Sequence, residues 1–210
     1  MRVYGGGPGP RPFRGTYGPV VILASGPSLT DEQCEYVRER QQAGACRVIA
    51  INSTCFRAPW ADTCYAFDWE WWHRYHAEAP DHKEKVTGSP QAAELYGLTL
   101  AHVVPGSGLS TKPGTVYSGL NSGHQAIQWA YQSGASAIYL LGYDMQHTGG
   151  RRHWHGDHPP GLTNAEGIQG WVPKFAPLAK ALALVGVPVV NCSTETALTC
   201  FERGRINDHL

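Results

Sequence analysis

Short apolar runs, each bounded by small or polar residues, recur along the chain and alternate with segments of helical spacing. Continuous runs of this kind are typical of strands buried on both faces of a parallel sheet. The runs that we interpret as strands are Val20–Ala24, Arg47–Asn52, Ala61–Phe67, Ala137–Gly142 and Val187–Cys192, with a shorter one near Leu100–Val104. Five strand–helix alternations predict an α/β fold, a single doubly wound Rossmann-like domain with a mostly parallel sheet.

Helices are predicted where apolar residues recur every three or four positions. The helices predicted in this way run from Thr30 to about Gln42, from His124 to Tyr131 and over Trp171–Val185. Trp69–His76 is also predicted to be helical, although its aromatic residues fall on several faces. Thr30 with Gln33 fits a capping box, and Ser122 is a candidate N-cap.

The remaining segments are predicted to be irregular. Residues 1–19 are rich in Gly, Pro and Arg and are interpreted as an irregular N-terminal arm, whereas residues 20–210 form one Rossmann-like nucleotide-binding domain. Ser107–Pro113 is expected to be a mobile surface segment of the kind in which lids occur. Thr196–Leu210 is expected to close over the pocket or over an edge of the fold.

A loop of small residues, Ser25, Gly26, Pro27 and Ser28, joins the first strand to the first helix. Such a loop allows the backbone to turn sharply and to approach a ligand closely. A strand, a small-residue loop and a helix start together place free backbone N–H groups beside a phosphate. The alternative is a tight βα turn that binds nothing.

Polar residues stand where several predicted strands end. Asn52, Asp68 and Asp144 occupy these positions, and Tyr143 precedes Asp144. Ligands of open α/β sheets bind in the crevice outside the carboxyl ends of the strands. A second ligand-facing helix start is predicted at Asn121, Ser122 and Gly123.

The densest polar cluster of the chain lies between two Gly-rich turns. Its members are Arg151, Arg152, His153, His155, Asp157 and His158. As an active-site loop, it would supply a His as general base and an Arg pair as phosphate clamp. His155 is the first choice as base because Asp157 could orient its imidazole, with His153 and His158 as close rivals. A metal site on the three His and a solvated loop of paired charges are the alternatives, and we assign no metal.

Composition narrows the class of protein. The net charge of zero, from 17 Lys+Arg and 17 Asp+Glu, argues against nucleic-acid or membrane binding driven by charge. No apolar run approaches the roughly 20 residues that span a bilayer, and the N-terminus lacks the apolar segment of a signal peptide, so we expect a cytoplasmic protein. Six Cys without a CxxC pair are interpreted as reduced core thiols, not as a disulfide framework or zinc site.

An ordered series of motifs resembles a known superfamily. The series is Ser25–Leu29, Asn52 at the next strand end, Asn121–Gly123 and Gly142–Met145. It resembles the bacterial lipooligosaccharide sialyltransferases, the motility accessory factor glycosyltransferases and the 6-hydroxymethylpterin pyrophosphokinase-like proteins, and looks most similar to small phage proteins of that superfamily. A phage protein would act in the host cytoplasm.

The resemblance implies roles for particular residues. In the sialyltransferases the first loop and the following Asn contact the CMP portion of the donor, and the helix start contacts the donor sugar or cytidine. A His after the strand end acts as base, and two Tyr hydroxyls assist departure of the phosphate. This chain departs from that pattern, since the loop after Asp144 has four His but no Tyr. Arg151 and Arg152 would then stabilise the phosphate.

The first hypothesis is therefore a nucleotide-sugar-dependent glycosyltransferase-like enzyme whose ligand is a small nucleotide or nucleotide-sugar donor, with CMP as one candidate. The second is a pyrophosphokinase or other nucleotidyl-group enzyme, in which Asp68 and Asp144 would hold Mg²⁺ through the phosphates. The third is a nucleotide-binding protein that sequesters its ligand without turnover. The sequence leaves homo-oligomerisation open.

Overall fold

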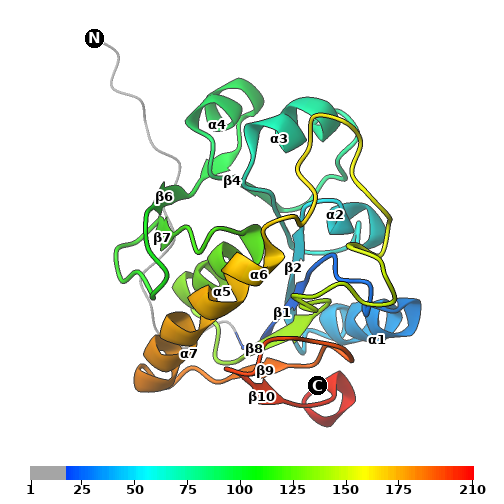
Figure 1. The fold of residues 1–210 in the computed structure, drawn as a ribbon, viewed down its shortest axis with the longest axis vertical. Coiled ribbons are helices and arrows are strands. Elements are labelled where there is room, and N and C mark those ends of the chain that lie inside the picture. The colour runs from blue at the N-terminus through cyan, green and yellow to red at the C-terminus, as the bar shows by residue number, and fades with distance from the viewer. Residues whose placement is uncertain (1–17) are drawn as a thin grey trace.

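A parallel sheet of eight strands forms the centre of the computed structural model, which describes residues 18–210 (Figure 1). The predicted arm over residues 1–19 thus lies almost wholly outside the described residues. From one edge to the other, the strands are β10 (Glu202–Arg203), β9 (Val189–Asn191), β8 (Ile138–Leu141), β1 (Val20–Leu23), β2 (Arg47–Ile51), β3 (Thr63–Tyr65), β4 (Glu84–Thr87) and β5 (Thr99–Leu100). A separate pair joins β6 (His102–Val104) to β7 (Thr115–Tyr117), also parallel. The predicted α/β fold class is confirmed.

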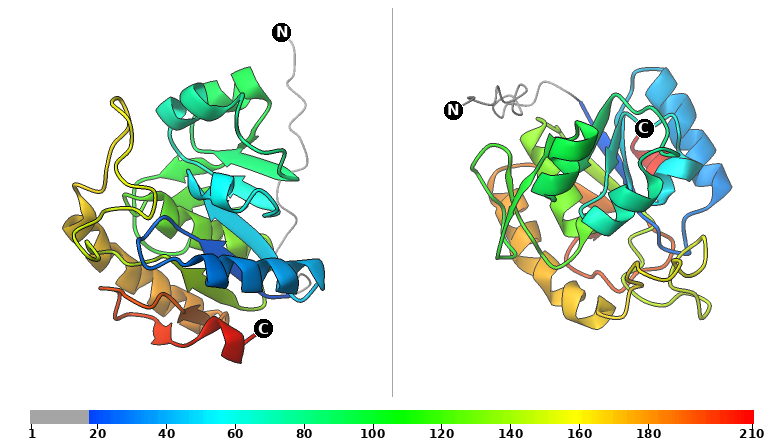
Figure 2. Two further views of the ribbon diagram at one scale, coloured as in Figure 1. Left: turned by 90° about the vertical axis from the view of Figure 1, so that its right-hand side faces the viewer. Right: turned by 90° about the horizontal axis from the view of Figure 1, so that it is seen from above.

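Helices cover both faces of the sheet (Figure 2). They are α1 (Asp31–Gln42), α2 (Thr54–Arg57), α3 (Trp69–Tyr75), α4 (Pro90–Tyr96), α5 (Ser122–Gln132), α6 (Ile168–Trp171) and α7 (Phe175–Leu184), with 3₁₀ turns at Val172–Lys174 and Ile206–Asp208. Within residues 18–210, none of the helices combines the length and the apolar character that crossing a bilayer requires.

Alternate residues of the central strands enter two separate cores. Val20 and Ile22 of β1 pack with α5 and α7, whereas Val21 and Leu23 pack with α1, α2 and α3. Successive side chains of a strand point to opposite faces, so a strand buried on both sides must be apolar throughout. This explains why the predicted strands are continuous apolar runs.

The strand order reverses beside β1. The chain proceeds from β1 outward through β2 and β3, and later returns to place β8 on the other side of β1. Val20 accordingly pairs with Arg47 of β2 and with Ile138 of β8. The carboxyl ends of β1 and β8 therefore flank a topological switch point, where sheets of this kind bind ligands.

Helix starts follow the capping signals in the sequence. Thr30 and Gln33 form the predicted capping box of α1, since each side chain accepts from the other residue's backbone N–H. The α5 cap lies one residue earlier than predicted, because Asn121 rather than Ser122 accepts from the His124 N–H, at 2.9 Å.

Two predicted elements are divided in the structure. The strand expected near Leu100–Val104 is split at Ala101 into β5 and β6, which belong to different sheets. The helix expected over Trp171–Val185 is interrupted by the 3₁₀ turn, with Pro173 in its first positions. Proline lacks the N–H that a continuous helix needs. The sequence analysis also missed β4, β7, β10, α2 and α4.

The segment before β7 is fixed to α5 by buried glutamines, so the expectation of a mobile surface segment is wrong at Ser110. The Ser110 N–H donates to Gln128 Oε1 at 3.1 Å, and the Gly114 N–H donates to Gln132 Oε1 at 2.9 Å. Gln132 Nε2 donates to the Thr115 carbonyl at 2.7 Å. Both glutamines are fully buried, so they replace backbone partners that this irregular segment lacks.

The C-terminal tail covers an edge of the sheet. Glu202–Arg203 pairs with β9 as the outermost strand, and the Tyr36 hydroxyl donates to the Leu210 carbonyl. The sequence left open whether the tail closes over the pocket or over an edge of the fold. In the structure it covers the edge and not the pocket.

Candidate functional site

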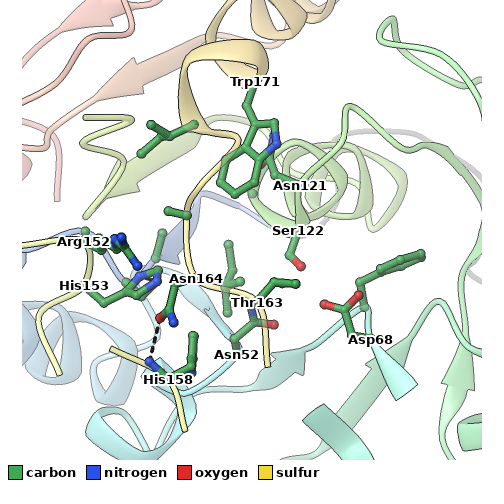
Figure 3. Close-up of a pocket in the computed structure, with 18 of the residues that line it drawn as sticks. Asn52, Asp68, Asn121, Ser122, Arg152, His153, His158, Thr163, Asn164 and Trp171 are labelled. Carbon is green, nitrogen blue, oxygen red and sulfur yellow. Dashed lines mark hydrogen bonds between the residues drawn. The ribbon is translucent and has the colours of Figure 1, made fainter. Parts of the chain in front are cut away.

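A cavity of about 670 Å³ opens at the carboxyl ends of β1, β2, β3 and β8 (Figure 3). Small-molecule sites usually occupy about 300–1,000 Å³. Most of the residues proposed from the sequence line it: Ser25, Gly26, Asn52, Asp68, Asn121, Ser122, Gly123, Asp144, Arg152, His153 and His158. The fold therefore brings together residues that are widely separated in the chain.

Asp144 joins the β1–α1 loop to the end of β8. Its carboxylate accepts from the Ser28 N–H at 3.0 Å and from the Ser28 hydroxyl at 2.5 Å. The Thr148 hydroxyl donates to it as well, at 2.6 Å. Burial raises the pKa of Asp144, although these hydrogen bonds act in the opposite direction. Asp144 is thus an anchor between two loops, and both of its oxygens are engaged.

Gly26 is required by packing between these loops. A Cβ at this position would lie 2.1 Å from Asp144 Oδ1 and 2.3 Å from the Gly142 carbonyl oxygen. The Gly26 N–H donates to that carbonyl at 2.9 Å. Close backbone approach does occur here, but the neighbour on that side is the protein itself and not a ligand.

Six of the proposed residues do not line the cavity: Pro27, Ser28, Tyr143, Arg151, His155 and Asp157. Ser28 is hydrogen-bonded to Asp144 instead. Tyr143 is buried and its hydroxyl donates to the Gly123 carbonyl at 3.0 Å, so it supports the start of α5. Pro27 and Arg151 line a separate shallow hollow beside Trp154.

Asn52 and Asp68 present polar groups from the ends of β2 and β3. Asn52 has a left-handed backbone, with φ of 49°, and its buried Oδ1 has no hydrogen-bond partner among the described residues. Such strained or unpaired groups gather at binding sites. Asp68 occupies the N-cap position of α3 without a side-chain cap bond, and burial, with Glu70 nearby, raises its pKa.

The start of α5 faces the same cavity. Asn121 and Ser122 lie on its wall, and Figure 3 shows Trp171 standing above them. The first N–H groups of a helix carry partial positive charge and favour an anion. This end of the cavity is therefore suited to a phosphate.

Trp154 fixes the loop that carries the polar cluster. Its N–H donates to the Ser25 carbonyl at 2.9 Å, and its indole nitrogen donates to the Thr54 hydroxyl at 3.2 Å. The Arg57 guanidinium lies 4.7 Å from its ring centre. With Trp154 held against the β1–α1 loop, Arg152 and His153 face the cavity and Arg151 does not.

Three imidazoles gather at the cavity rim. The rings of His153 and His155 are stacked 5.1 Å apart, and His158 lies 4.9 Å from His153. Burial, reinforced by the neighbouring imidazoles, lowers the pKa of His153 to about 3, and burial with His158 lowers that of His155 to about 4. Both rings are therefore neutral near pH 7.

His153 is the imidazole best placed to act on a ligand. Its Nδ1 lies 3.0 Å from the Ser25 hydroxyl, and its buried Nε2 has no hydrogen-bond partner in the part of the chain that the structure describes. The expected orientation of His155 by Asp157 is absent, because the ionic partner of the exposed Asp157 carboxylate is Arg152, at 3.9 Å. His155 also lies outside the cavity lining, whereas His153 and His158 belong to it.

Two side-chain groups among residues 18–210 could hold a metal ion. One is His153, His155 and His158, whose ligand atoms lie within 4.8 Å of one another, so the metal interpretation of this loop keeps geometric support. The other, Cys55, Cys64 and His82, is buried.

The sequence analysis missed the far wall of the cavity. Thr163, Asn164 and Trp171 line it, and Asn164 Oδ1 accepts from the His158 N–H at 2.6 Å (Figure 3). No periodicity marks this stretch, although an Asn after a Pro-Pro-Gly turn could have been examined. No family model matches this chain, and neither a curated protein nor a solved structure does.

Proposed function

We propose that this protein is a nucleotide-sugar-dependent glycosyltransferase-like enzyme that binds its donor in the cavity at the switch point. One observation carries the proposal: the α5 N-terminus, the Arg152 cation and an unpartnered His153 nitrogen converge on a single cavity of suitable size. The first two favour a phosphate, and the third can accept a proton.

The donor phosphate would lie between Arg152 and the start of α5. Within residues 18–210, Arg152 is held by ion pairs of 3.4 Å to Glu166 and 3.9 Å to Asp157, both of which are exposed. Exposed pairs of this length contribute little, so a phosphate could replace them. The unpaired Asn52 Oδ1 would accept from an amino or hydroxyl group of the nucleoside, and Trp171 would supply an apolar wall.

In the proposed reaction an acceptor hydroxyl attacks the sugar carbon. Its proton passes to His153 Nε2, the new carbon–oxygen bond forms, and the sugar–phosphate bond breaks with its electron pair remaining on the nucleotide. Arg152 and the helix end stabilise that charge. A pKa near 3 makes His153 a weak base in the empty cavity, but the negative charge of a bound donor raises the basicity of an adjacent imidazole.

One contact weighs against the pyrophosphokinase alternative. The Asp144 oxygens accept three hydrogen bonds from Ser28 and Thr148, so Mg²⁺ binding through Asp144 would require these bonds to break. The cysteines among the described residues are free thiols, which fits the reducing cytoplasm where we propose the enzyme acts.

Calorimetry with nucleotides and nucleotide sugars tests the binding step. Arg152→Ala should weaken donor binding by roughly 10–100-fold, the effect of losing a charge-assisted hydrogen bond. Arg151→Ala is the matched control, because Arg151 lies outside the cavity, and should bind like the parent. Equal affinities for the two variants would reject this phosphate site.

A transfer assay then tests the chemistry. His153→Ala should reduce release of nucleotide from the donor by about two to four orders of magnitude while the donor still binds. Tight binding without any product from the parent protein would instead support the nucleotide-sequestering alternative.

A further inference from the structure

Two cysteines and a histidine meet inside the protein, away from the cavity lining. Cys55 comes from α2, Cys64 from β3, and His82 from the loop before β4. Both cysteines are fully buried and His82 is 6% exposed. Their ligand atoms lie within 4.8 Å of one another, and the cluster is enclosed by the core that packs against α1, α2 and α3.

The hydrogen bond of His82 shows which ring nitrogen a neutral imidazole leaves free. Its Nδ1 lies 2.9 Å from the Ala61 carbonyl oxygen, and a carbonyl can only accept, so Nδ1 carries the hydrogen. Nε2 then has a free lone pair. That atom is buried and has no hydrogen-bond partner of normal length among residues 18–210, although the Cys55 thiol lies close enough to interact with the ring. Buried polar atoms are nearly always paired, so an orphan nitrogen in the group that includes two thiols requires an explanation.

We propose that Cys55, Cys64 and His82 bind one Zn²⁺ ion. Two thiolates and an imidazole are preferred zinc ligands. Carbonyl-bound Nδ1–H is the usual means of orienting a metal-binding histidine. On binding, both thiols release their protons to solvent, and two thiolates balance the charge of the ion. A neutral cluster of this kind suits a buried site, where an unbalanced charge is costly.

Because two thiolates balance two positive charges, the cluster favours Zn²⁺ over a monovalent soft ion. Three protein ligands leave one position of the tetrahedral coordination open. Lone buried cysteines such as Cys34 and Cys192 belong to no such group among the described residues. The ligands are widely spaced in the sequence, which is why the absence of a CxxC pair led to a different interpretation of the cysteines.

The ion would join three elements, two of which adjoin residues that line the cavity. Asn52 directly precedes the turn into α2, and Asp68 follows β3. Zinc would thus fix the positions from which these two side chains reach the ligand. The site itself does not depend on the proposed function.

Zinc content and affinity of the full chain test the proposal. Metal-free protein is titrated with Zn²⁺ against a chromophoric chelator. The parent should bind one ion at this site, and Cys64→Ser should lower its affinity by more than the 10–100-fold typical of changes next to a metal ligand. Cys34→Ser, another buried thiol, is the matched control and should bind zinc like the parent.

A second control separates this site from the histidine loop. His155→Ala should retain the zinc that Cys64→Ser loses; loss in His155→Ala with retention in Cys64→Ser would overturn the proposal. Because Cys64→Ser could fail to fold, Co²⁺ is also added to the unaltered metal-free chain. A thiolate-to-cobalt charge-transfer band is expected, and its absence would equally overturn the site. Neither readout involves a nucleotide, so this failure is distinct from failure of the proposed function.

Discussion

Replacing Gln132 by Leu should destabilise the protein through the segment that it holds. Gln132 is fully buried on α5. Its amide accepts from the Gly114 N–H at 2.9 Å and donates to the Thr115 carbonyl at 2.7 Å. Longer bonds of 3.3 Å also reach the Ser110 and Lys112 carbonyls. Leucine has a similar size and fills the space, so the substitution removes all four hydrogen bonds without leaving a large cavity.

The size of the effect is set mainly by the two backbone groups that make the shortest bonds to Gln132. Gly114 and Thr115 are both buried, and each unsatisfied buried group costs about 1–3 kcal/mol. Removing the amide itself from the core offsets about 1–2 kcal/mol. The net loss in the free energy of unfolding is therefore about 1–4 kcal/mol, equivalent to a fall in Tm of roughly 2–15 °C for a chain of this length.

Urea unfolding followed by circular dichroism measures this loss. Gln42→Leu is the matched control, because Gln42 is exposed in the last turn of α1, and should change stability by less than about 0.5 kcal/mol. Hydrogen exchange adds a local readout, since the Gly114 amide should lose protection only in Gln132→Leu. A Gln132→Leu variant as stable as the control would refute the role assigned to the buried glutamines.

Three further predictions follow from contacts around the cavity. The raised pKa of Asp144 means that its favourable contribution is complete below its ordinary pKa near 4 and is lost as pH rises through the folded value. Asp144→Asn should therefore gain stability relative to the parent as pH rises above about 4, and a difference in urea unfolding that stays constant with pH would contradict this. Gly26→Val should lower Tm as well as ligand binding, because the new Cβ would lie 2.1 Å from Asp144 Oδ1; a thermal melt identical to the parent's would exclude this steric clash. Trp154→Ala should loosen the loop after β8 and speed its limited proteolysis, since the bond to Thr54 and the contact with Arg57 are lost; an unchanged cleavage rate would argue against Trp154 as the anchor.

The central fold could be predicted because its signals are local. Runs such as Val20–Leu23 are apolar on both faces, and the Thr30 capping box is readable from two residues. Weakly patterned elements were missed: β4 reads Glu-Lys-Val-Thr, and three of its four residues are polar. The signals of α4 were present, however, in Ser89 as N-cap and Gly97 as left-handed C-cap.

The candidate site was predictable only where it lies on strand ends and helix starts. Asn52, Asp68 and Asn121 could be placed because the direction of a strand or helix fixes where its end points. The loop after β8 belongs to no strand or helix whose direction would fix where its side chains point. Which of Arg151 and Arg152 faces the cavity depends on where Trp154 lies, a contact between residues far apart in the chain, and left-handed glycines such as Gly149 and Gly156 set the path of the loop.

The pairing of β1 with β8 also determines when the protein can fold. Val20 lies beside Ile138, so the ribosome must synthesise the chain past β8 before the second side of β1 is covered. β2 and β3 emerge much earlier and can pair first, which leaves one edge of β1 with unpaired N–H and C=O groups during synthesis. Contacts so distant in sequence form slowly, and an open strand edge is prone to aggregation. The switch point that creates the cavity is thus also the last part of the sheet centre to close. A nascent chain that stalls before Ile138 leaves this edge of β1 unpaired, because α5 packs on a face of the sheet and cannot replace β8 at its edge.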